Sequence, residues 1–147
     1  MAVFSQAERE LIDAARVGRL STVDSEGRPH LVPICFVLVD GCFYSLIDNK
    51  PKASKQGLKR LRNIAANPSV AFLIDHYEED WRHLAYLLVH GSASVVTEPD
   101  QYVRALEALR FKYSQYRGQS FELVRDPMIR VDVARSHYWA AKPGLVS

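Results

Sequence analysis

The chain has 147 residues, 48% of them hydrophobic, which is the usual size and composition of one globular domain. Lysine and arginine number 19 against 17 acidic residues, so a net charge of +2 gives no general attraction for nucleic acid or an anionic membrane. Charged Glu8, Arg9 and Glu10 stand where a signal peptide needs an apolar run, and no stretch has the length of a membrane span. We therefore expect a single cytoplasmic domain over residues 1–147.

The N-terminal segment predicts a helix from Gln6 to Val17. Ser5 and Glu8 have the spacing of a capping box, in which each residue satisfies a free backbone N–H of the first turn. Apolar Leu11 and Ile12 follow at helical spacing. The helix is expected to end at the glycine that comes next.

Three strands are expected after this helix, over Arg19–Asp24, Pro29–Val39 and Cys42–Ile47. All three segments are rich in β-branched, aromatic and other apolar residues. Asp40-Gly41, between the second and third segments, is a strong signal for a two-residue hairpin turn. Consecutive hairpins predict that these strands form a meander.

The Asp40-Gly41 turn determines which side chains share a face of the sheet. One face carries Ile34, Phe36, Leu38, Phe43, Ser45 and Ile47, and the other carries Cys35, Val37, Val39, Cys42, Tyr44 and Leu46. Because both faces are apolar, the second must be covered by a helix or by another subunit, which is the argument for a homodimer. Ser45 is the one polar residue on its face, and its buried hydroxyl needs a partner, either the backbone or a ligand.

The two cysteines, Cys35 and Cys42, flank this turn. In the predicted register they lie too far apart for a disulfide. Neither has the spacing of a metal ligand. Both are expected to be reduced and buried, as is usual in the cytoplasm.

The rest of the chain alternates strands and short helices. We expect a helix over residues 58–65 that stops at Asn67-Pro68, strands over Ser69–Ile74 and Leu84–Val96, and a helix capped by Thr97 and closed by Gly118. A strand over Met128–Ser136 follows, and His137–Ala140 either continues it or pairs back against it. Six or seven strands without βαβ alternation predict a mainly β protein, an antiparallel barrel with short helices added.

Positive charge is concentrated in residues 50–62, KPKASKQGLKRLR, which contain no acid. The cations are Lys50, Lys52, Lys55, Lys59, Arg60 and Arg62. At the start of a short helix, where free N–H groups also favour anions, such a cluster suits a phosphate or another small polyanion. The alternative is a solvated basic helix face. A nucleic-acid site needs interleaved aromatic residues, and this stretch has none.

No motif for a catalytic nucleophile, a zinc protease or a nucleotide-binding loop occurs, so we assign no catalytic residue and no metal ligand. The five histidines are scattered over predicted strands and turns. His30 is the best candidate for a substrate contact at the edge of a cofactor, because it begins the strand that leads into Pro33.

In the order of its segments, nearly the whole chain resembles the pyridoxamine-5'-phosphate-oxidase-like, FMN-binding split β-barrel superfamily, and within it the small F420-dependent oxidoreductases. The matching pieces are the N-terminal helix with RLSTVDSEGRPHLVPICF, then VDGCFYSLID, then LKRLRNIAANPSVAFLID, and finally DW followed by LLVHGSASVV. The resemblance implies a split β-barrel of six to seven strands and three to four short helices.

The resemblance also implies roles for particular residues. Lys59 and Arg60 would hold the cofactor phosphate, Ser45 would touch the cofactor, Pro33 and Ile34 would back its ring system, and Trp81 would lie near the ring or the dimer contact. An insertion around residues 48–57 departs from the oxidase pattern. Its lysines, among them Lys52 and Lys55, suit the acidic oligoglutamate tail of the deazaflavin F420, which FMN lacks.

The implied function is that of a homodimeric oxidoreductase that transfers hydride between coenzyme F420 and an unknown small molecule. An FMN-binding flavoprotein is the first alternative. A split-barrel haem-binding protein, with His83 or His90 as the iron ligand, is the second. A cofactor carrier without turnover is the third. The residues that recognise pyridoxal phosphate are not found, so a vitamin B6 enzyme is not expected.

Overall fold

The computed structural model describes residues 3–48 and 55–141. The helices in these residues are α1 (Gln6–Ala14), α2 (Lys55–Ala66) and α3 (Pro99–Lys112), with two short 3-10 helices, η1 (Trp81–His83) and η2 (Ser114–Tyr116). The strands are β1 (Gly18–Val23), β2 (Pro29–Ile34), β3 (Val37–Val39), β4 (Cys42–Leu46), β5 (Ser69–His76), β6 (Ala85–Val95) and β7 (Met128–Ala140).

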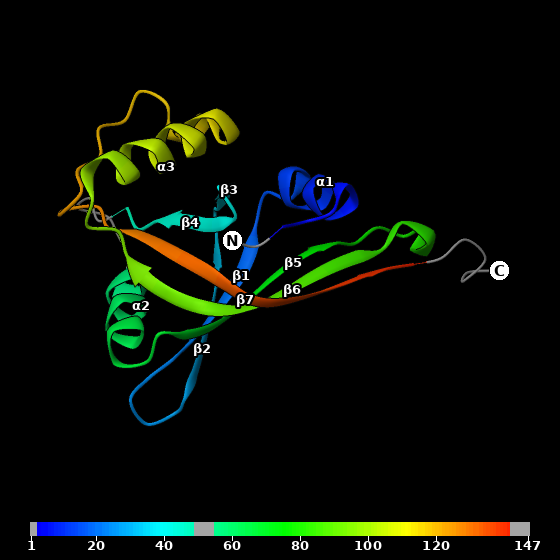
Figure 1. Ribbon diagram of the computed structural model, residues 1–147, viewed down its shortest axis with the longest axis horizontal. Helices are drawn as coiled ribbons and strands as arrows, with labels where there is room; N and C mark the ends of the chain where they lie inside the picture. Colours follow the sequence, from blue (N-terminus) through cyan, green and yellow to red (C-terminus); the bar gives the residue numbers. More distant parts are fainter. Residues whose placement is uncertain (1–2, 49–54, 142–147) are drawn as a thin grey trace.

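All seven strands belong to one antiparallel sheet, in the order β2-β1-β5-β6-β7-β4-β3. β2 and β3 follow each other in the chain yet lie at opposite edges, because the sheet curls into a half-barrel (Figure 1). The mainly β, split-barrel prediction and its strand count are confirmed. The predicted meander is wrong, because β2 does not pair with β3 or β4.

The chain leaves the sheet at Cys35 and Phe36, in the middle of what the sequence predicts as one long strand. The Phe36 N–H donates to the hydroxyl of Tyr113 at 3.1 Å, and that hydroxyl also lies 3.1 Å from the Phe36 carbonyl oxygen. The Tyr113 hydroxyl, just after α3, thus makes the backbone hydrogen bonds that a neighbouring strand would otherwise make. The Phe36 backbone is satisfied while the chain crosses from one sheet edge to the other.

The predicted turn at Asp40-Gly41 is confirmed. Both residues have positive φ, 50° and 80°, as a type I′ turn requires, and Val39 pairs with Cys42 across it. The two cysteines are free, but they are half-buried and not fully buried as predicted.

Each face of β4 packs into its own hydrophobic cluster. The first lies inside the curled sheet, where the rings of Phe36, Phe43 and Phe72 meet edge to face. The second includes Tyr44 and lies under α3. The apolar second face predicted from the sequence is therefore covered by a helix of the same chain. It gives no support to a homodimer.

Two of the predicted helix boundaries need correction. α1 has the predicted capping box at Ser5 but ends at Ala14, before Val17. α3 is capped by Glu98, whose carboxylate accepts from the Gln101 N–H at 2.8 Å, and it ends well before Gly118. The segment after α3 instead folds into η2, because its tyrosines pack back under the helix.

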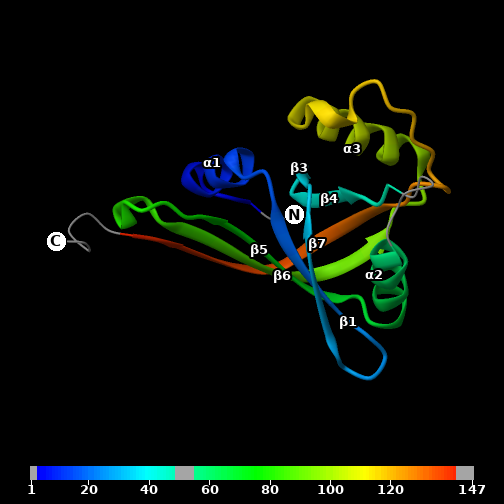
Figure 2. The ribbon, with the colours of Figure 1, turned by 180° about the vertical axis from the view of Figure 1, so that it is seen from behind.

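The hairpin of β5 and β6, with β7 beside it, extends away from the rest of the molecule as a long ribbon (Figures 1 and 2). η1 forms its tip. β6 bulges between His90 and Gly91, where a Cβ atom on Gly91 would lie 2.2 Å from the Asp132 carbonyl oxygen. In the described residues, no helix is long and apolar enough to cross a membrane.

Candidate functional site

A buried hydrogen bond fixes helix α2 against the sheet. The Asn63 side-chain amide donates to the hydroxyl of Thr22 on β1 at 3.0 Å, and both side chains are buried. Thr22 pairs across the ladder with His30 on β2. Lys59 and Arg60 lie four and three residues before Asn63, one helical turn along the same side of α2. The Asn63 anchor therefore brings His30 together with the two cations.

The electrostatic interaction between these residues supports their proximity. Burial lowers the pKa of His30 below its ordinary value of 6.5, and the charges of Lys59 and Arg60 lower it further. A neutral imidazole is thus favoured beside the two cations. We call these three residues, His30, Lys59 and Arg60, the cationic corner.

Two nitrogen atoms of the cationic corner are buried without a partner. In the described structure, neither His30 Nε2 nor Arg60 Nε makes a hydrogen bond. A buried polar atom left unpaired costs about 1–3 kcal/mol, so each of these atoms calls for a partner, either water or a bound ligand. Arg60 Nε is a donor, and its charge calls for an acceptor oxygen. The corner therefore fits an oxygen-rich anion such as a phosphate.

Arg60 has a neighbour that the sequence gave no reason to expect. Burial of the guanidinium lowers the pKa of Arg60, and the electrostatic effect of Tyr116, in η2, opposes this shift. Tyr116 also hydrogen-bonds to Cys35, and its own pKa is raised chiefly by burial. Its ring packs edge to face between Tyr113 and Phe121. Tyr116 is thus fixed by its own packing, and its interaction with Arg60 is electrostatic.

Ser45 has the backbone partner that was one of its two predicted options. Its hydroxyl donates to the Cys35 carbonyl oxygen at 2.8 Å, and the side chain is buried. Cys35 in turn hydrogen-bonds to Tyr116, so Ser45, Cys35 and Tyr116 are linked. The hydroxyl oxygen still has lone pairs for a further donor.

The two residues expected to back the ring system lie on opposite faces of β2. Ile34 is buried in the first hydrophobic cluster. It lies on the same face of β2 as His30, four residues earlier, because side chains alternate between the two faces along a strand. Pro33 is exposed on the other face. The two side chains therefore point to opposite faces of β2, and a role of this strand in backing a ring system stays a prediction.

The predicted lysines of the insertion are described only in part. Lys55 is the first residue of α2, but its side chain lies outside the part of the structure that is described, which for this helix begins at Leu58. Lys52 lies outside the described residues. Their role toward the cofactor tail stays a prediction.

Trp81 lies far from the cationic corner within one chain. It begins η1 at the tip of the long ribbon, whereas α2 lies at the opposite end of the molecule (Figures 1 and 2). Its side chain is 50% exposed. Beside the tip is a groove of about 390 Å³ whose lining includes Leu73, Tyr86 and Trp139. The Tyr86 and Trp139 rings stack with centroids 5.9 Å apart.

The two histidines considered as haem ligands have different surroundings. His83 is exposed at the ribbon tip, and its Nδ1 lies 2.5 Å from a Glu78 carboxylate oxygen. His90 is half-buried at the bulge in β6. The two side chains do not belong to one cluster.

Comparison with known proteins matches the chain to one family. The model of the pyridoxamine 5'-phosphate oxidase family matches residues 4–140. A 5a,11a-dehydrotetracycline/5a,11a-dehydrooxytetracycline reductase from Streptomyces rimosus is 30% identical over 94 residues, which are 63% of this chain and 64% of the reductase. The match thus spans less than two thirds of that relative.

Solved structures share the fold at low identity. An FAD-binding protein from Mesorhizobium loti has a TM-score of 0.65 at 21% identity, over 92% of this chain and 94% of its own. The haem-storage protein HutZ from Vibrio cholerae has a TM-score of 0.69 at 16% identity, over 95% of each chain. One fold therefore occurs in proteins named for different cofactors, and the cofactor must be argued from the residues of the site.

Proposed function

The chain belongs to the pyridoxamine 5'-phosphate oxidase family, and we propose that it is an oxidoreductase that holds the phosphate of coenzyme F420 at the cationic corner. The observation that carries this proposal is the pair of unpaired buried nitrogens, His30 Nε2 and Arg60 Nε, next to Lys59. Phosphate oxygens would satisfy both. The reductase relative supports redox chemistry.

In this proposal the chain binds and orients the cofactor. When bound, the deazaflavin would supply the hydride, as redox cofactors in general carry the reactive atom. Lys59 and Arg60 neutralise the phosphate, and Asn63 keeps α2 in place so that the two cations stay fixed. The substrate is a small molecule that accepts or gives hydride at the ring.

The lysines that precede the cationic corner in the sequence support F420 over FMN. Lys50, Lys52 and Lys55 precede the cationic corner without an intervening acid. A chain of glutamates extending from the phosphate would meet these lysines, and FMN has no such tail. Because exposed charge pairs are screened by salt, binding through the tail should weaken as ionic strength rises.

We also propose that the protein is a homodimer. Trp81 and the cationic corner lie at opposite ends of one chain (Figure 2), so a site that uses both needs two chains. The aromatic groove beside Tyr86 and Trp139 is an apolar surface that a second copy can cover. Sedimentation equilibrium should give a dimer at micromolar concentration, and a monomer under all conditions would contradict this part of the proposal.

Cofactor titration of matched variants tests the cationic corner. One charge-assisted hydrogen bond contributes about 1.5–3 kcal/mol, so Arg60→Ala should weaken F420 binding about 10- to 150-fold. Arg62→Ala removes the same charge from an exposed position two residues away and should change the affinity little. Equal affinity of the wild type and Arg60→Ala would remove Arg60 from the site.

The same titration, run with FMN and haemin in parallel, separates the alternatives. Tighter binding of F420 that weakens with salt supports the deazaflavin. Tighter binding of FMN without salt dependence makes the protein a flavoprotein. A Soret band that is lost in His83→Ala or His90→Ala, with no flavin binding, favours the haem-binding protein. Tight F420 binding without turnover of any acceptor indicates a carrier.

A further inference from the structure

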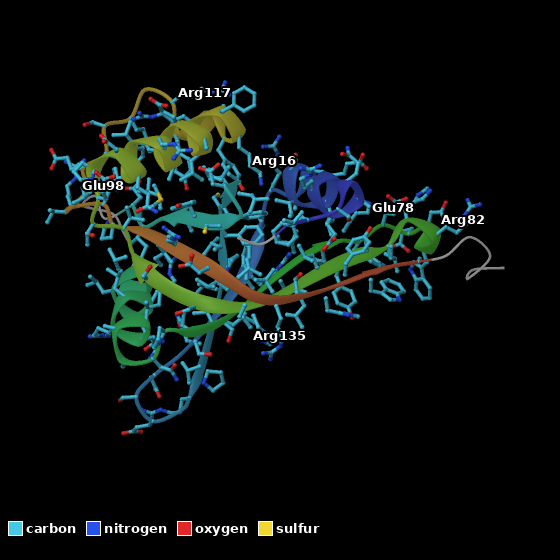
Figure 3. All side chains as sticks on the ribbon, viewed as in Figure 1. Arg16, Glu78, Arg82, Glu98, Arg117 and Arg135 are labelled. Atoms are coloured by element: carbon cyan, nitrogen blue, oxygen red, sulfur yellow. The ribbon has the colours of Figure 1, made fainter. Side chains whose placement is uncertain are left out.

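The tip of the ribbon gathers ionisable side chains that the proposed function does not use. They are His76 at the end of β5, Glu78 and Asp80 in the turn, and His83 at the end of η1. We call these four residues the tip cluster. Figure 3 shows Glu78 at this end of the molecule, away from the main body.

Two carboxylates face one imidazole nitrogen in the tip cluster. His83 Nδ1 lies 2.5 Å from a Glu78 oxygen and 3.9 Å from an Asp80 oxygen. One ligand atom from each of these three residues lies within 4.8 Å of the other two. Without a metal, a single N–H proton of His83 can serve only Glu78, and the Asp80 carboxylate is bound by Arg82. A metal ion, by contrast, can bind the nitrogen and both carboxylates at once.

The turn holds these donors in place. The Asp80 carboxylate caps η1 by accepting from the Arg82 N–H at 3.2 Å, and the His83 N–H donates to the Asp80 carbonyl at 3.1 Å. His76 Nε2 lies 2.6 Å from the second oxygen of Glu78. Metal-binding carboxylates are commonly oriented by such an outer hydrogen bond.

We propose that Glu78, Asp80 and His83 bind a divalent first-row transition metal ion such as Zn²⁺, with His76 orienting Glu78. The donor set of one imidazole nitrogen and two carboxylates, completed by water, suits Zn²⁺ and its neighbours. Mg²⁺ and Ca²⁺ prefer a shell of oxygens alone. Typical Zn–N and Zn–O lengths of about 2.0–2.2 Å require modest rotations of exposed side chains.

One neighbouring charge opposes the metal. Arg82 donates to both Asp80 oxygens, at 2.9 and 2.7 Å, so its guanidinium competes for a ligand. This competition distinguishes a metal site from a set of ion pairs. Removing Arg82 should loosen the ion pairs but strengthen metal binding, by about two- to fivefold.

Calorimetric titration of the tag-free chain with Zn²⁺, and the visible absorption of bound Co²⁺, test the proposal. We expect one ion per chain in the wild type. His83→Ala and Glu78→Gln should each reduce the affinity more than about 100-fold, and His76→Ala about 10- to 100-fold. Arg82→Gln should bind more tightly than the wild type. His137→Ala, which removes an exposed histidine of β7, is the matched control and should bind like the wild type.

Two results would overturn the metal site. The first is that the wild type takes up no Zn²⁺ at millimolar concentration. The second is that His83→Ala and Glu78→Gln bind as tightly as the wild type. Because the four side chains are exposed or half-buried, the variants are expected to fold, and far-UV circular dichroism checks this. The readouts involve no flavin, so their outcome is independent of the proposed function.

Discussion

The cationic corner and the tip cluster lie at opposite ends of the molecule, and their ionisable groups differ in whether they have partners. At the tip, each imidazole already faces a carboxylate and the groups are largely exposed. At the corner, two buried nitrogens have no partner in the described structure, and cations lie next to a histidine. A cation can bind at the tip only by displacing protons, whereas an anion at the corner supplies a partner that is missing.

The two regions should also differ in how much of the fold depends on them. Asn63→Ala removes the buried bond that anchors α2 and leaves the Thr22 hydroxyl unpaired, which should cost about 1–3 kcal/mol in the free energy of unfolding. Urea denaturation measures this loss. Asp80→Asn at the tip should change the stability far less, because exposed ion pairs contribute little.

A double-mutant cycle sharpens the Asn63 prediction. The combined Asn63→Ala, Thr22→Val variant should lose less stability than the sum of the two single variants, since the hydroxyl is no longer left unpaired. Additive losses would mean that the Asn63 amide stabilises α2 through some other contact. F420 affinity should fall in parallel in the Asn63→Ala variant.

A smaller effect is expected from Tyr116 if its hydroxyl restrains Arg60, with which it interacts electrostatically. Tyr116→Phe keeps the ring in its cluster but removes the hydroxyl, so Arg60 becomes freer before the cofactor binds. F420 affinity should fall about 2- to 10-fold, the range of one ordinary hydrogen bond. Tyr77→Phe, at the exposed tip, should leave the affinity unchanged. A wild-type affinity in Tyr116→Phe would mean that the hydroxyl does not restrain Arg60.

The smallest effect is a pH dependence of opposite sign in the two regions. The hydrogen bond to Glu78 raises the pKa of His83, so its contribution to stability is present below about pH 6.5 and lost as the pH rises through the raised value. The pKa of His30 is lowered, so its contribution is present above about pH 6.5 and lost as the pH falls through the lowered value.

Urea unfolding of two glutamine variants at about pH 5 and about pH 8, with a chelator present, measures this difference. His83→Gln should be less stable than the wild type at the lower pH and similar to it at the higher. His30→Gln should be more stable than the wild type at the lower pH and similar at the higher. The same sign of change in both variants would show that the two histidines do not have the environments described.

The sequence predicted the parts of the fold that depend on residues within a few positions of one another. The capping box at Ser5, the turn at Asp40-Gly41 and the division of residues between the two faces of β4 depend on neighbours within a few positions. The concentration of cations at Lys59 and Arg60 is visible for the same reason. Each of these features needs no knowledge of distant contacts.

Apart from the ends of α1 and α3, the features that the sequence did not predict depend on distant partners. The break after Ile34 is invisible because residues 29–39 read as one continuous strand, and the group that satisfies Phe36 is Tyr113, far along the chain. Tyr116 belongs to no motif, and its packing with Tyr113 and Phe121 forms only when η2 folds under α3. The covering of the second sheet face by α3 also depends on residues that are far apart in the sequence.

The most direct test of the central claim is a crystal structure of the protein with F420. We predict that the phosphate lies at the cationic corner, with an oxygen within hydrogen-bond distance of Arg60 Nε and another near His30 Nε2, and with Lys59 beside them. A phosphate bound elsewhere, with both nitrogens still unpaired, would contradict the account of this site.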